Sequence, residues 1–238
     1  MVGFTSPPRS LAELEIRADR LAGLSVEEVR VLVGKRAPEE ARRAKGYVGE
    51  LIEVFLGASA GSRAEPDFPE LGVELKTLPI GPNGRPTEST FVCTIELSRL
   101  DGSDWESSRV KKKLDRVLWV PVEGQRSIPL PERRFGTPFL WLPNAAESAQ
   151  LQRDWEELAG LVVQGRTPEI TGHLGLVLQV RPKAASSRST RRAYDEDGAP
   201  YAELPRGFYL RATFTSSLLD ARFSRLAEAE RDDRGTEI

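Results

Sequence analysis

The sequence predicts a single α/β domain in which helices and strands are mixed along the chain. Segments with helical periodicity alternate with short segments rich in strand-forming residues. Hydrophobic residues make up 39% of the 238 residues and charged residues 29%, which is typical of a globular protein with a sizeable core. No internal repeat or linker divides the chain, so we expect one domain with two lobes.

Six segments carry the apolar spacing or the capping residues of helices. Ser25 and Glu28 form a capping-box pattern, and Gly34 stops the helix that they begin. A first-turn pattern at Pro38 leads into a broad apolar face that ends at Gly57. We predict helices over residues 11–22, 25–33, 46–56, 104–114, 146–163 and 215–226.

Six further segments are rich in strand-forming residues. The turn residues 81–86 separate the first two of these segments and predict that they pair as a hairpin. Residues 184–200 are polar, basic and rich in small residues, which predicts a mobile loop, and residues after 227 are expected to fray. We predict strands over residues 73–78, 90–97, 116–122, 139–142, 173–180 and 208–214.

The composition excludes several classes of site. Cys93 is the only cysteine and His173 the only histidine, which rules out an internal disulfide, a cysteine zinc cluster and His-based zinc hydrolysis. No apolar run approaches the ~20 residues of a membrane span, and residues 1–8 lack the pattern of a signal peptide. We therefore expect a cytoplasmic protein.

Gly57, Ser59 and Gly61 match the G-x-S-x-G pattern of serine hydrolases, with His173 downstream. In those enzymes the serine of the motif is the nucleophile and lies on a turn from a strand into a helix. Here a predicted helix precedes the motif, and a loop leading to a strand follows it. We interpret the motif as the end of a helix and a connecting loop.

Basic residues are clustered although the net charge is only −2. Residues 109–116 contain five basic residues and one acid, and residues 181–192 contain five more basic residues and no acid. Such clusters can bind phosphate groups, since screening limits each contact to about a Debye length. The alternative is that both clusters are solvated faces.

The candidate chemistry lies in residues 67–76. Residues 73–77 alternate apolar and polar, so Glu74 and Lys76 point to the same face of a strand. Asp67 lies one short loop upstream and can return to the same place. Glu53 falls on the polar side of the preceding helix and can supply a third carboxylate.

Carboxylates gathered at one place repel one another unless a cation neutralises them. Mg²⁺ prefers oxygen ligands, so it can bridge Asp67 and Glu74, polarise a phosphate oxygen and activate a water. Lys76 can then stabilise the developing charge or help to deprotonate the water. The residues alone thus predict metal-assisted hydrolysis at phosphate, the alternative being a surface ion pair between Glu74 and Lys76.

Asp67, Glu74 and Lys76, preceded by Glu53, resemble the D…(D/E)-x-K signature of the restriction-endonuclease-like nuclease superfamily. More narrowly, the chain resembles the MutH family of strand-nicking endonucleases in methyl-directed mismatch repair. The short signature is weak by itself, and an ordered set of segments over roughly residues 10–225 carries the narrower resemblance. These segments are residues 45–49, 56–62, 72–77, 90–93, 116–124, 181–185 and 204–210.

The resemblance implies a restriction-endonuclease-like core, with a central mixed β-sheet flanked by helices and two lobes around a DNA cleft. The catalytic lobe is expected over about residues 10–125, the DNA-reading lobe over about residues 126–226, and a tail over residues 227–238. The implied activity is Mg²⁺-dependent nicking of the unmethylated strand, 5′ of the G, at hemimethylated GATC sites. The implied enzyme is a monomer that MutL activates directly, with MutS acting indirectly.

The resemblance also implies roles for particular residues. Lys45 corresponds to a phosphate-contacting lysine. Arg181 and Lys183 correspond to a loop that reads bases, and guanine acceptors are their expected partners. Phe91 and Tyr209 correspond to aromatic residues that approach the adenine and sense its methylation. The implied catalytic residues are Glu53, Asp67, Glu74, Lys76 and Lys113, and the implied Mg²⁺ ligands are Asp67, Glu74 and Leu75.

Two alternatives to the nickase remain. The first is a GATC-cutting type II restriction enzyme of the same superfamily, which cuts both strands. One catalytic set in a monomer of 238 residues cannot cut both strands at once, which favours nicking. The second is a DNA-binding module without catalysis, in which Glu74 and Lys76 only form an ion pair.

Overall fold

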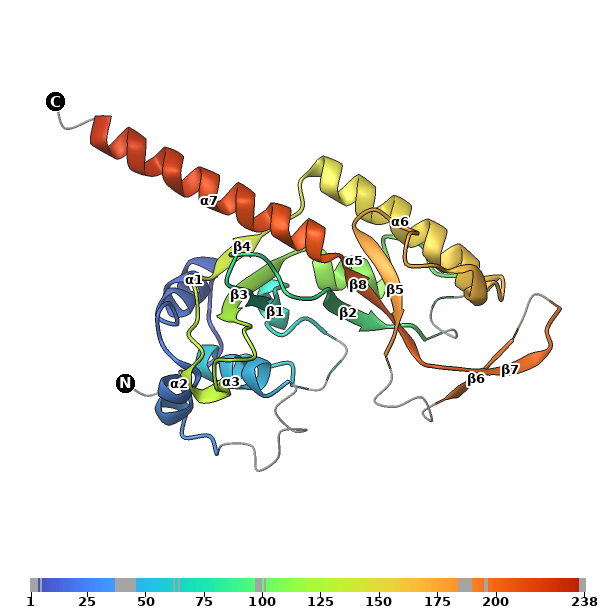
Figure 1. Cartoon of the computed structure of the whole chain (residues 1–238), viewed down its shortest axis with the longest axis horizontal. Helices are drawn as coiled ribbons and strands as arrows, with labels where there is room; N and C mark the ends of the chain where they lie inside the picture. The colour runs from blue at the N-terminus through green and yellow to red at the C-terminus, as the bar shows by residue number, and fades with distance from the viewer. Residues whose placement is uncertain are drawn as a thin grey trace.

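The computed structural model contains two main β-sheets, each covered by helices (Figure 1). The strand order is β1-β3-β4 in the first sheet and β2-β8-β5 in the second, and β6 and β7 form a separate hairpin. The structure describes residues 4, 6–36, 46–61, 63, 65–96, 100, 102–183, 190–194 and 197–235.

The first sheet is mixed and lies between two hydrophobic cores. It consists of β1 (Glu74–Ile80), β3 (Val117–Glu123) and β4 (Phe139–Trp141). β1 pairs in parallel with β3, and β4 pairs antiparallel with the other edge of β3. Along β3, Trp119 enters one core and Leu118 and Val120 enter the other. The α/β class and the mixed sheet are thereby confirmed.

Three helices cover one face of the first sheet: α1 (Leu11–Asp19), α2 (Val26–Val33) and α3 (Tyr47–Leu56). The predicted capping box is present at the start of α2, and Gly34 ends that helix with φ 67°. Arg17 is buried in this layer and donates hydrogen bonds of 2.6 and 2.9 Å to the carbonyls of Ser6 and Leu56.

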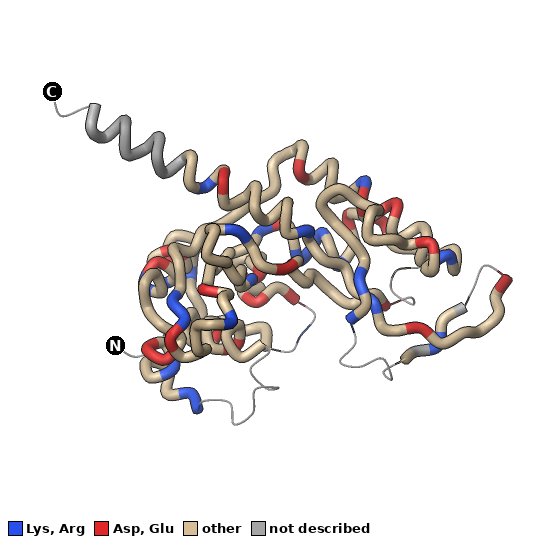
Figure 2. The backbone as a smooth tube through the Cα atoms, in the orientation of Figure 1, with Lys and Arg blue, Asp and Glu red and all other residues tan. Residues whose placement is uncertain are grey.

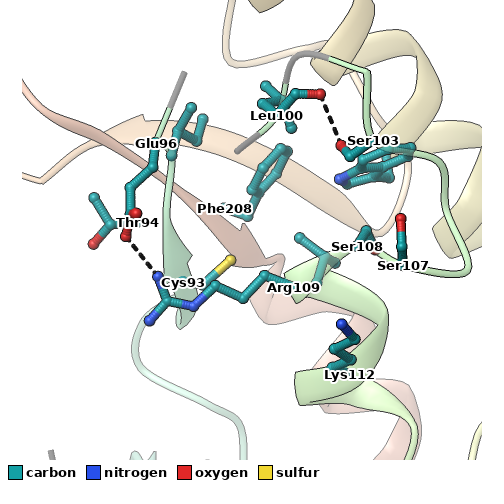
Figure 3. Close-up of a pocket in the computed structure, with 13 residues that line it drawn as sticks. Cys93, Thr94, Glu96, Leu100, Ser103, Ser107, Ser108, Arg109, Lys112 and Phe208 are labelled. Atoms are coloured by element: carbon teal, nitrogen blue, oxygen red, sulfur yellow. Dashed lines mark hydrogen bonds and ion pairs between the residues drawn. The ribbon is translucent and has the colours of Figure 1, made fainter. Parts of the chain in front are cut away.

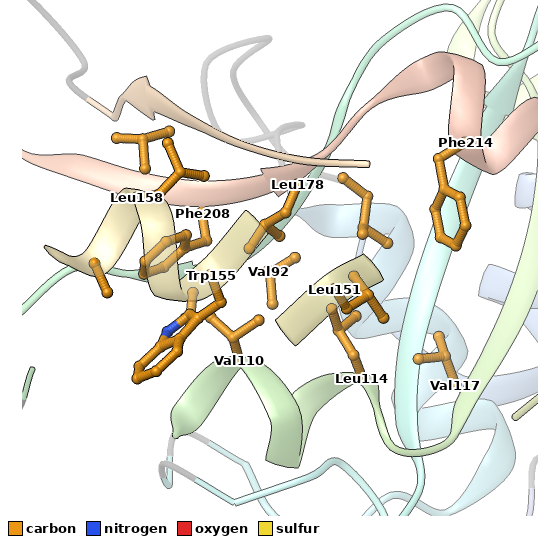
Figure 4. Close-up of a cluster of buried hydrophobic side chains, with 14 of the residues drawn as sticks. Val92, Val110, Leu114, Val117, Leu151, Trp155, Leu158, Leu178, Phe208 and Phe214 are labelled. Carbon is orange, nitrogen blue, oxygen red and sulfur yellow. The ribbon is translucent and has the colours of Figure 1, made fainter. Parts of the chain in front are cut away.

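The second sheet is antiparallel and consists of β2 (Thr90–Thr94), β8 (Arg206–Leu210) and β5 (Leu178–Pro182). Its inner face packs against α5 (Arg109–Leu114), α6 (Ala145–Val163) and the start of α7 (Ala212–Gly235). Figure 4 shows side chains of this core, among them Trp155, Leu178 and Phe208. α6 lies over the second sheet, and α7 projects away from the remainder of the fold (Figure 1).

The predicted hairpin of residues 73–78 with residues 90–97 is wrong. β1 pairs with β3, and β2 pairs with β8 in the other sheet. β1 has buried residues on both faces, as a parallel strand between two helical layers requires, whereas antiparallel strands commonly leave one face in water. The two sheets interleave along the sequence, because β2 precedes β3 and β4 precedes β5 and β8.

Other boundaries also differ from the predictions. Ser108 caps α5, and the residues before it form turns instead of helix. β8 ends at Leu210, and α7 continues to Gly235, where fraying was predicted. The predicted loop at residues 184–200 contains β6 (Arg191–Tyr194), which pairs with β7 (Pro200–Glu203). The described residues also include three 3-10 turns: η2 (Pro69–Leu71), η3 (Leu130–Glu132) and η4 (Thr167–Glu169). None of the described helices is both long and apolar enough to cross a membrane.

β5 begins at Leu178 and not at residue 173, because two side chains hold the preceding segment as a loop. The Asp154 carboxylate, only 3% exposed, accepts the N–H groups of Val177 and Leu178 at 2.7 and 2.8 Å. The Arg211 guanidinium donates to three carbonyls on the same loop, those of Gly172, Leu174 and Gly175. These contacts fix where β5 starts.

We expect Asp154→Ala to lower the free energy of unfolding by about 2–4 kcal/mol, since two N–H groups lose a buried charged acceptor. Urea unfolding followed by circular dichroism measures the change. Glu156→Ala, on the exposed side of the same helix, is the matched control and should change stability by at most about 0.5 kcal/mol. Equal effects of the two substitutions would show that Asp154 does not hold the loop.

Candidate active site

A buried carboxylate with two ammonium partners forms the centre of the site. Glu74, at the start of β1, is 3% exposed. Its Oε1 accepts from Lys76 Nζ at 2.7 Å, and its Oε2 accepts from Lys113 Nζ at 2.7 Å. Strand alternation thus brings Glu74 and Lys76 together as predicted, and α5 delivers Lys113 to the same carboxylate. Lys113 also donates to the carbonyl of Glu65 at 2.8 Å.

Asp67 returns to β1 through a tight loop. Phe68 and Val73 exchange backbone hydrogen bonds of 2.9 and 3.2 Å, and Gly72 turns the chain with φ 61°. As a result, Asp67 Oδ2 accepts from the N–H of Leu75 at 2.7 Å. This contact places Asp67 beside the strand that carries Glu74.

The backbone of Leu75 faces Asp67 and not the neighbouring strand. The N–H of Glu74 donates to the carbonyl of Arg116 beside β3, so Glu74 directs its backbone toward β3. Successive residues of a strand direct their backbone groups to opposite edges, and therefore the carbonyl of Leu75 points to the edge where Asp67 lies. The apolar side chain of Leu75 is buried, so this carbonyl is the group that it can offer to a cation.

Glu53 lies close enough to the other carboxylates to interact with them. It is half-buried on α3, and burial raises its pKa, with a further rise from the negative charge of Asp67. Burial also raises the pKa of Asp67, and the charge of Glu74 adds to that rise. Each carboxylate disfavours the charged form of its neighbour, which is the condition that a bound cation relieves.

The donor set suits a hard divalent cation held by two carboxylates. Within the described part of the chain, no group of three or more His, Cys, Asp or Glu side chains is arranged to hold a metal ion. Mg²⁺ is commonly held by one or two carboxylates and keeps several waters. Asp67, Glu74 and the carbonyl of Leu75 fit that requirement, with Glu53 adding charge nearby. Each oxygen of Glu74 accepts one lysine hydrogen bond and keeps a second lone pair that can bind a cation.

The predicted DNA-reading residues lie together on the outer face of the second sheet. Tyr209 on β8 is paired with Phe91 on β2 and with Gln179 on β5, and the Phe91 and Tyr209 rings meet edge to face at 5.3 Å. Lys183 Nζ lies 3.5 Å from the centroid of the Phe91 ring. Arg181 follows Gln179 by two residues and shares its face of the strand.

Three residues on this face carried no predicted role: Ser89, Gln179 and Gly207. A Cβ atom at Gly207 would lie 2.8 Å from the Phe91 ring, so glycine lets that ring lie over β8. The alternation of side chains along β5 could have placed Gln179 beside Arg181 in advance. Ser89 has no such local signal, because its contacts come from a strand 90 residues away in sequence.

The basic cluster at residues 109–116 is not a free cationic stripe. Lys111 pairs with Asp115 at 2.9 Å, and Arg109 pairs with Glu96 at 2.8 Å. Arg116 donates to the carbonyl of Leu71. Figure 2 shows basic and acidic residues interspersed along the described chain. The positive charge of α5 is therefore directed mainly to contacts within the protein.

The remaining residues considered in the sequence analysis are Lys45, Ser59 and His173. Lys45 lies outside the described residues. Ser59 follows α3, whose end is capped by Gly57 with φ 80°, so the strand-turn-helix of a serine-hydrolase nucleophile does not occur there. His173 is exposed in the loop before β5.

A cavity of about 220 Å³ lies between β2 and α5, lined by Cys93, Arg109, Trp155 and Phe208 among others. Figure 3 shows the Arg109 guanidinium directed at Glu96, with the Cys93 sulfur nearby. Burial raises the pKa of the Cys93 thiol to about 11, so it stays protonated at neutral pH. Cys93 is therefore a packed thiol and not an activated nucleophile.

We expect Glu53→Gln to stabilise the fold at neutral pH. The pKa of Glu53 is raised in the folded state, so its charge is unfavourable there once the pH exceeds the ordinary value of 4.5. The stability gained by the substitution should be absent below that pH and grow as the pH rises through the raised pKa. Thermal unfolding between pH 4 and pH 8 tests this, with Glu156→Gln as the exposed control. A gain that is the same at every pH would contradict the assigned cause.

Comparison with known proteins identifies the family of the chain. The family model described as "DNA mismatch repair enzyme MutH" matches residues 56–154. A DNA mismatch repair protein MutH from Pectobacterium atrosepticum is 52% identical over 223 residues, covering 94% of this chain and 96% of that protein. The MutH proteins of Yersinia enterocolitica and Escherichia coli are 51% and 50% identical over 218 residues, each covering 92% of this chain. The chain belongs to the MutH family of DNA mismatch repair enzymes.

Proposed function

We propose that this member of the MutH family is a Mg²⁺-dependent endonuclease that nicks the unmethylated strand at hemimethylated GATC sites. The observation that carries the proposal is the site at the start of β1. There a buried Glu74, in contact with both Lys76 and Lys113, lies near Asp67. Carboxylates and lysines in this arrangement suit phosphodiester hydrolysis.

In the proposed mechanism the chain's own residues hold and neutralise the reacting phosphate. Asp67, Glu74 and the Leu75 carbonyl would hold Mg²⁺, which when bound supplies positive charge to a phosphate oxygen and lowers the pKa of a coordinated water. Release of Lys76 from Glu74 frees its ammonium group to stabilise the charge that develops on the phosphate. Lys113, which donates to the other oxygen of Glu74, can stabilise the charge on the phosphate in the same way.

Recognition is assigned to the outer face of the second sheet. An arginine can contact the O6 and N7 acceptors of guanine with two hydrogen bonds, which suits the exposed Arg181, and Lys183 can donate to the same acceptors. The Phe91–Tyr209 pair offers an apolar edge at which an adenine N6-methyl group can be distinguished by its size. We assign activation to MutL, with MutS acting through it, and we expect a cytoplasmic monomer.

A GATC-cutting restriction enzyme is the second candidate, because it would share this site. One catalytic centre among the described residues supports a nick by a monomer. Incubation with unmethylated, hemimethylated and fully methylated GATC duplexes, in Mg²⁺ or in chelator, separates the two. We expect cuts only in unmethylated strands, only with Mg²⁺, and faster when MutL is present. Double-strand breaks without MutL would favour the restriction enzyme, and no cleavage with MutL and Mg²⁺ would contradict both.

We expect Lys76→Ala to abolish cleavage while DNA binding is largely kept. The substitution removes the ammonium group assigned to the phosphate but leaves the reading face unchanged. Single-turnover cleavage and fluorescence anisotropy measure the two effects separately. Lys111→Ala, on α5 and paired with Asp115, is the control and should cut at nearly the wild-type rate. A Lys76→Ala protein that still cut at that rate would refute the role given to this lysine.

We expect Arg181→Ala to reduce discrimination between GATC and single-base variants of it by about 1–3 kcal/mol, the value of a two-bond contact with guanine. Affinities for a panel of substituted duplexes give the discrimination directly. Arg166→Ala serves as the control, because Arg166 pairs with Glu169 outside the reading face. Unchanged discrimination in Arg181→Ala would remove this residue from base recognition.

A further inference from the structure

Ser89 accepts hydrogen bonds from two side chains of β5. Gln179 Nε2 donates to Ser89 Oγ at 2.8 Å, and Arg181 Nη1 donates to the same oxygen at 3.3 Å. A serine hydroxyl has two acceptor lone pairs, so these two donors use both. Ser89 directly precedes β2, and β2 and β5 flank β8. The contacts therefore join the two strands on either side of the strand that carries Tyr209.

We infer that Ser89 and Gln179 form a bracket that holds the Arg181 guanidinium in the orientation used to read the base, an inference that rests on the proposed function. Gln179 is only 8% exposed, whereas Arg181 is exposed. The buried amide fixes the position of the hydroxyl, and the hydroxyl then restrains the exposed guanidinium. Ser89 and Gln179 are positioning residues, since they act on DNA through Arg181.

Restraint of this arginine bears on specificity more than on affinity. A free arginine has many rotamers and can reach phosphates or neighbouring bases, which yields binding without discrimination. A guanidinium already held in one orientation loses less freedom when it meets its guanine. Loss of the bracket should therefore weaken binding to the correct site more than binding to a wrong one.

Binding in Ca²⁺, which avoids cleavage, tests the inference with two fluorescent duplexes, one with GATC and one with its guanine replaced. For each protein we measure one ratio, the dissociation constant for the substituted duplex divided by that for the GATC duplex, so that a larger ratio means stronger discrimination. We expect Ser89→Ala and Gln179→Leu each to lower the ratio about fivefold, the effect of one typical hydrogen bond. Ser89→Thr keeps the hydroxyl and should restore most of the ratio. Ser103→Ala, which loses a hydroxyl bonded to the Leu100 carbonyl, is the control.

A double-mutant cycle separates positioning from a general effect on folding. If Ser89 acts through Arg181, Ser89→Ala should change the ratio less than about twofold when Arg181 is already alanine. A full additional loss in that background, or a Ser89→Ala ratio equal to that of wild type, would overturn the bracket while the proposed function stands. A wild-type protein that bound both duplexes equally would overturn the proposed function, and the bracket with it.

Discussion

The buried charge of Glu74 is the constraint on which the site depends. Removing a carboxylate from water costs several kcal/mol unless partners compensate for the lost hydration. Lys76 and Lys113 supply that compensation, each at 2.7 Å. Lys113 reaches Glu74 only because Val110 and Leu114 anchor α5 in the core of the second sheet. The charge at the start of β1 thus depends on the packing of a helix from the other half of the fold.

The compensation is incomplete, and this prepares the site for a cation. When all are ionised, the three carboxylates Glu53, Asp67 and Glu74 face two ammonium groups, which leaves one negative charge in excess. Burial is the main cause of the raised pKa values of Glu53 and Asp67, and the neighbouring negative charges add to it. A divalent cation at Asp67 and Glu74, as proposed, would reverse the sign of this excess charge. In the proposed mechanism the same lysines therefore first offset most of the carboxylate charge and later contact the phosphate.

Local patterns in the sequence predicted much of the fold and of the site, but they did not predict contacts between residues that are far apart in the sequence. The capping box of α2 and the shared face of Glu74 and Lys76 follow from spacing alone. The parallel pairing of β1 with β3 does not, because it depends on helical layers that cover both faces of the sheet. Lys113 was predicted as a site residue only from the family resemblance, because 39 residues separate it from Glu74 in the sequence. The start of β5 was misplaced because Asp154 and Arg211, which hold its loop, are distant in sequence.

The proposed catalytic residues and the proposed base-reading residues lie on different sheets, so their relative position has to be maintained by something that both sheets share. One candidate is the exposed contact of Arg85, after β1, with Ser216 and Asp220 on α7. Exposed ion pairs contribute only about 0–1 kcal/mol, which is too little to fix the relative position of the two sheets. The common core is the stronger link, since Leu78 of β1 and Trp119 of β3 pack in one cluster with Leu178 and Phe208 of the second sheet. Substitutions in that cluster should therefore disturb cutting and reading together, whereas loss of Arg85 should leave both nearly unchanged.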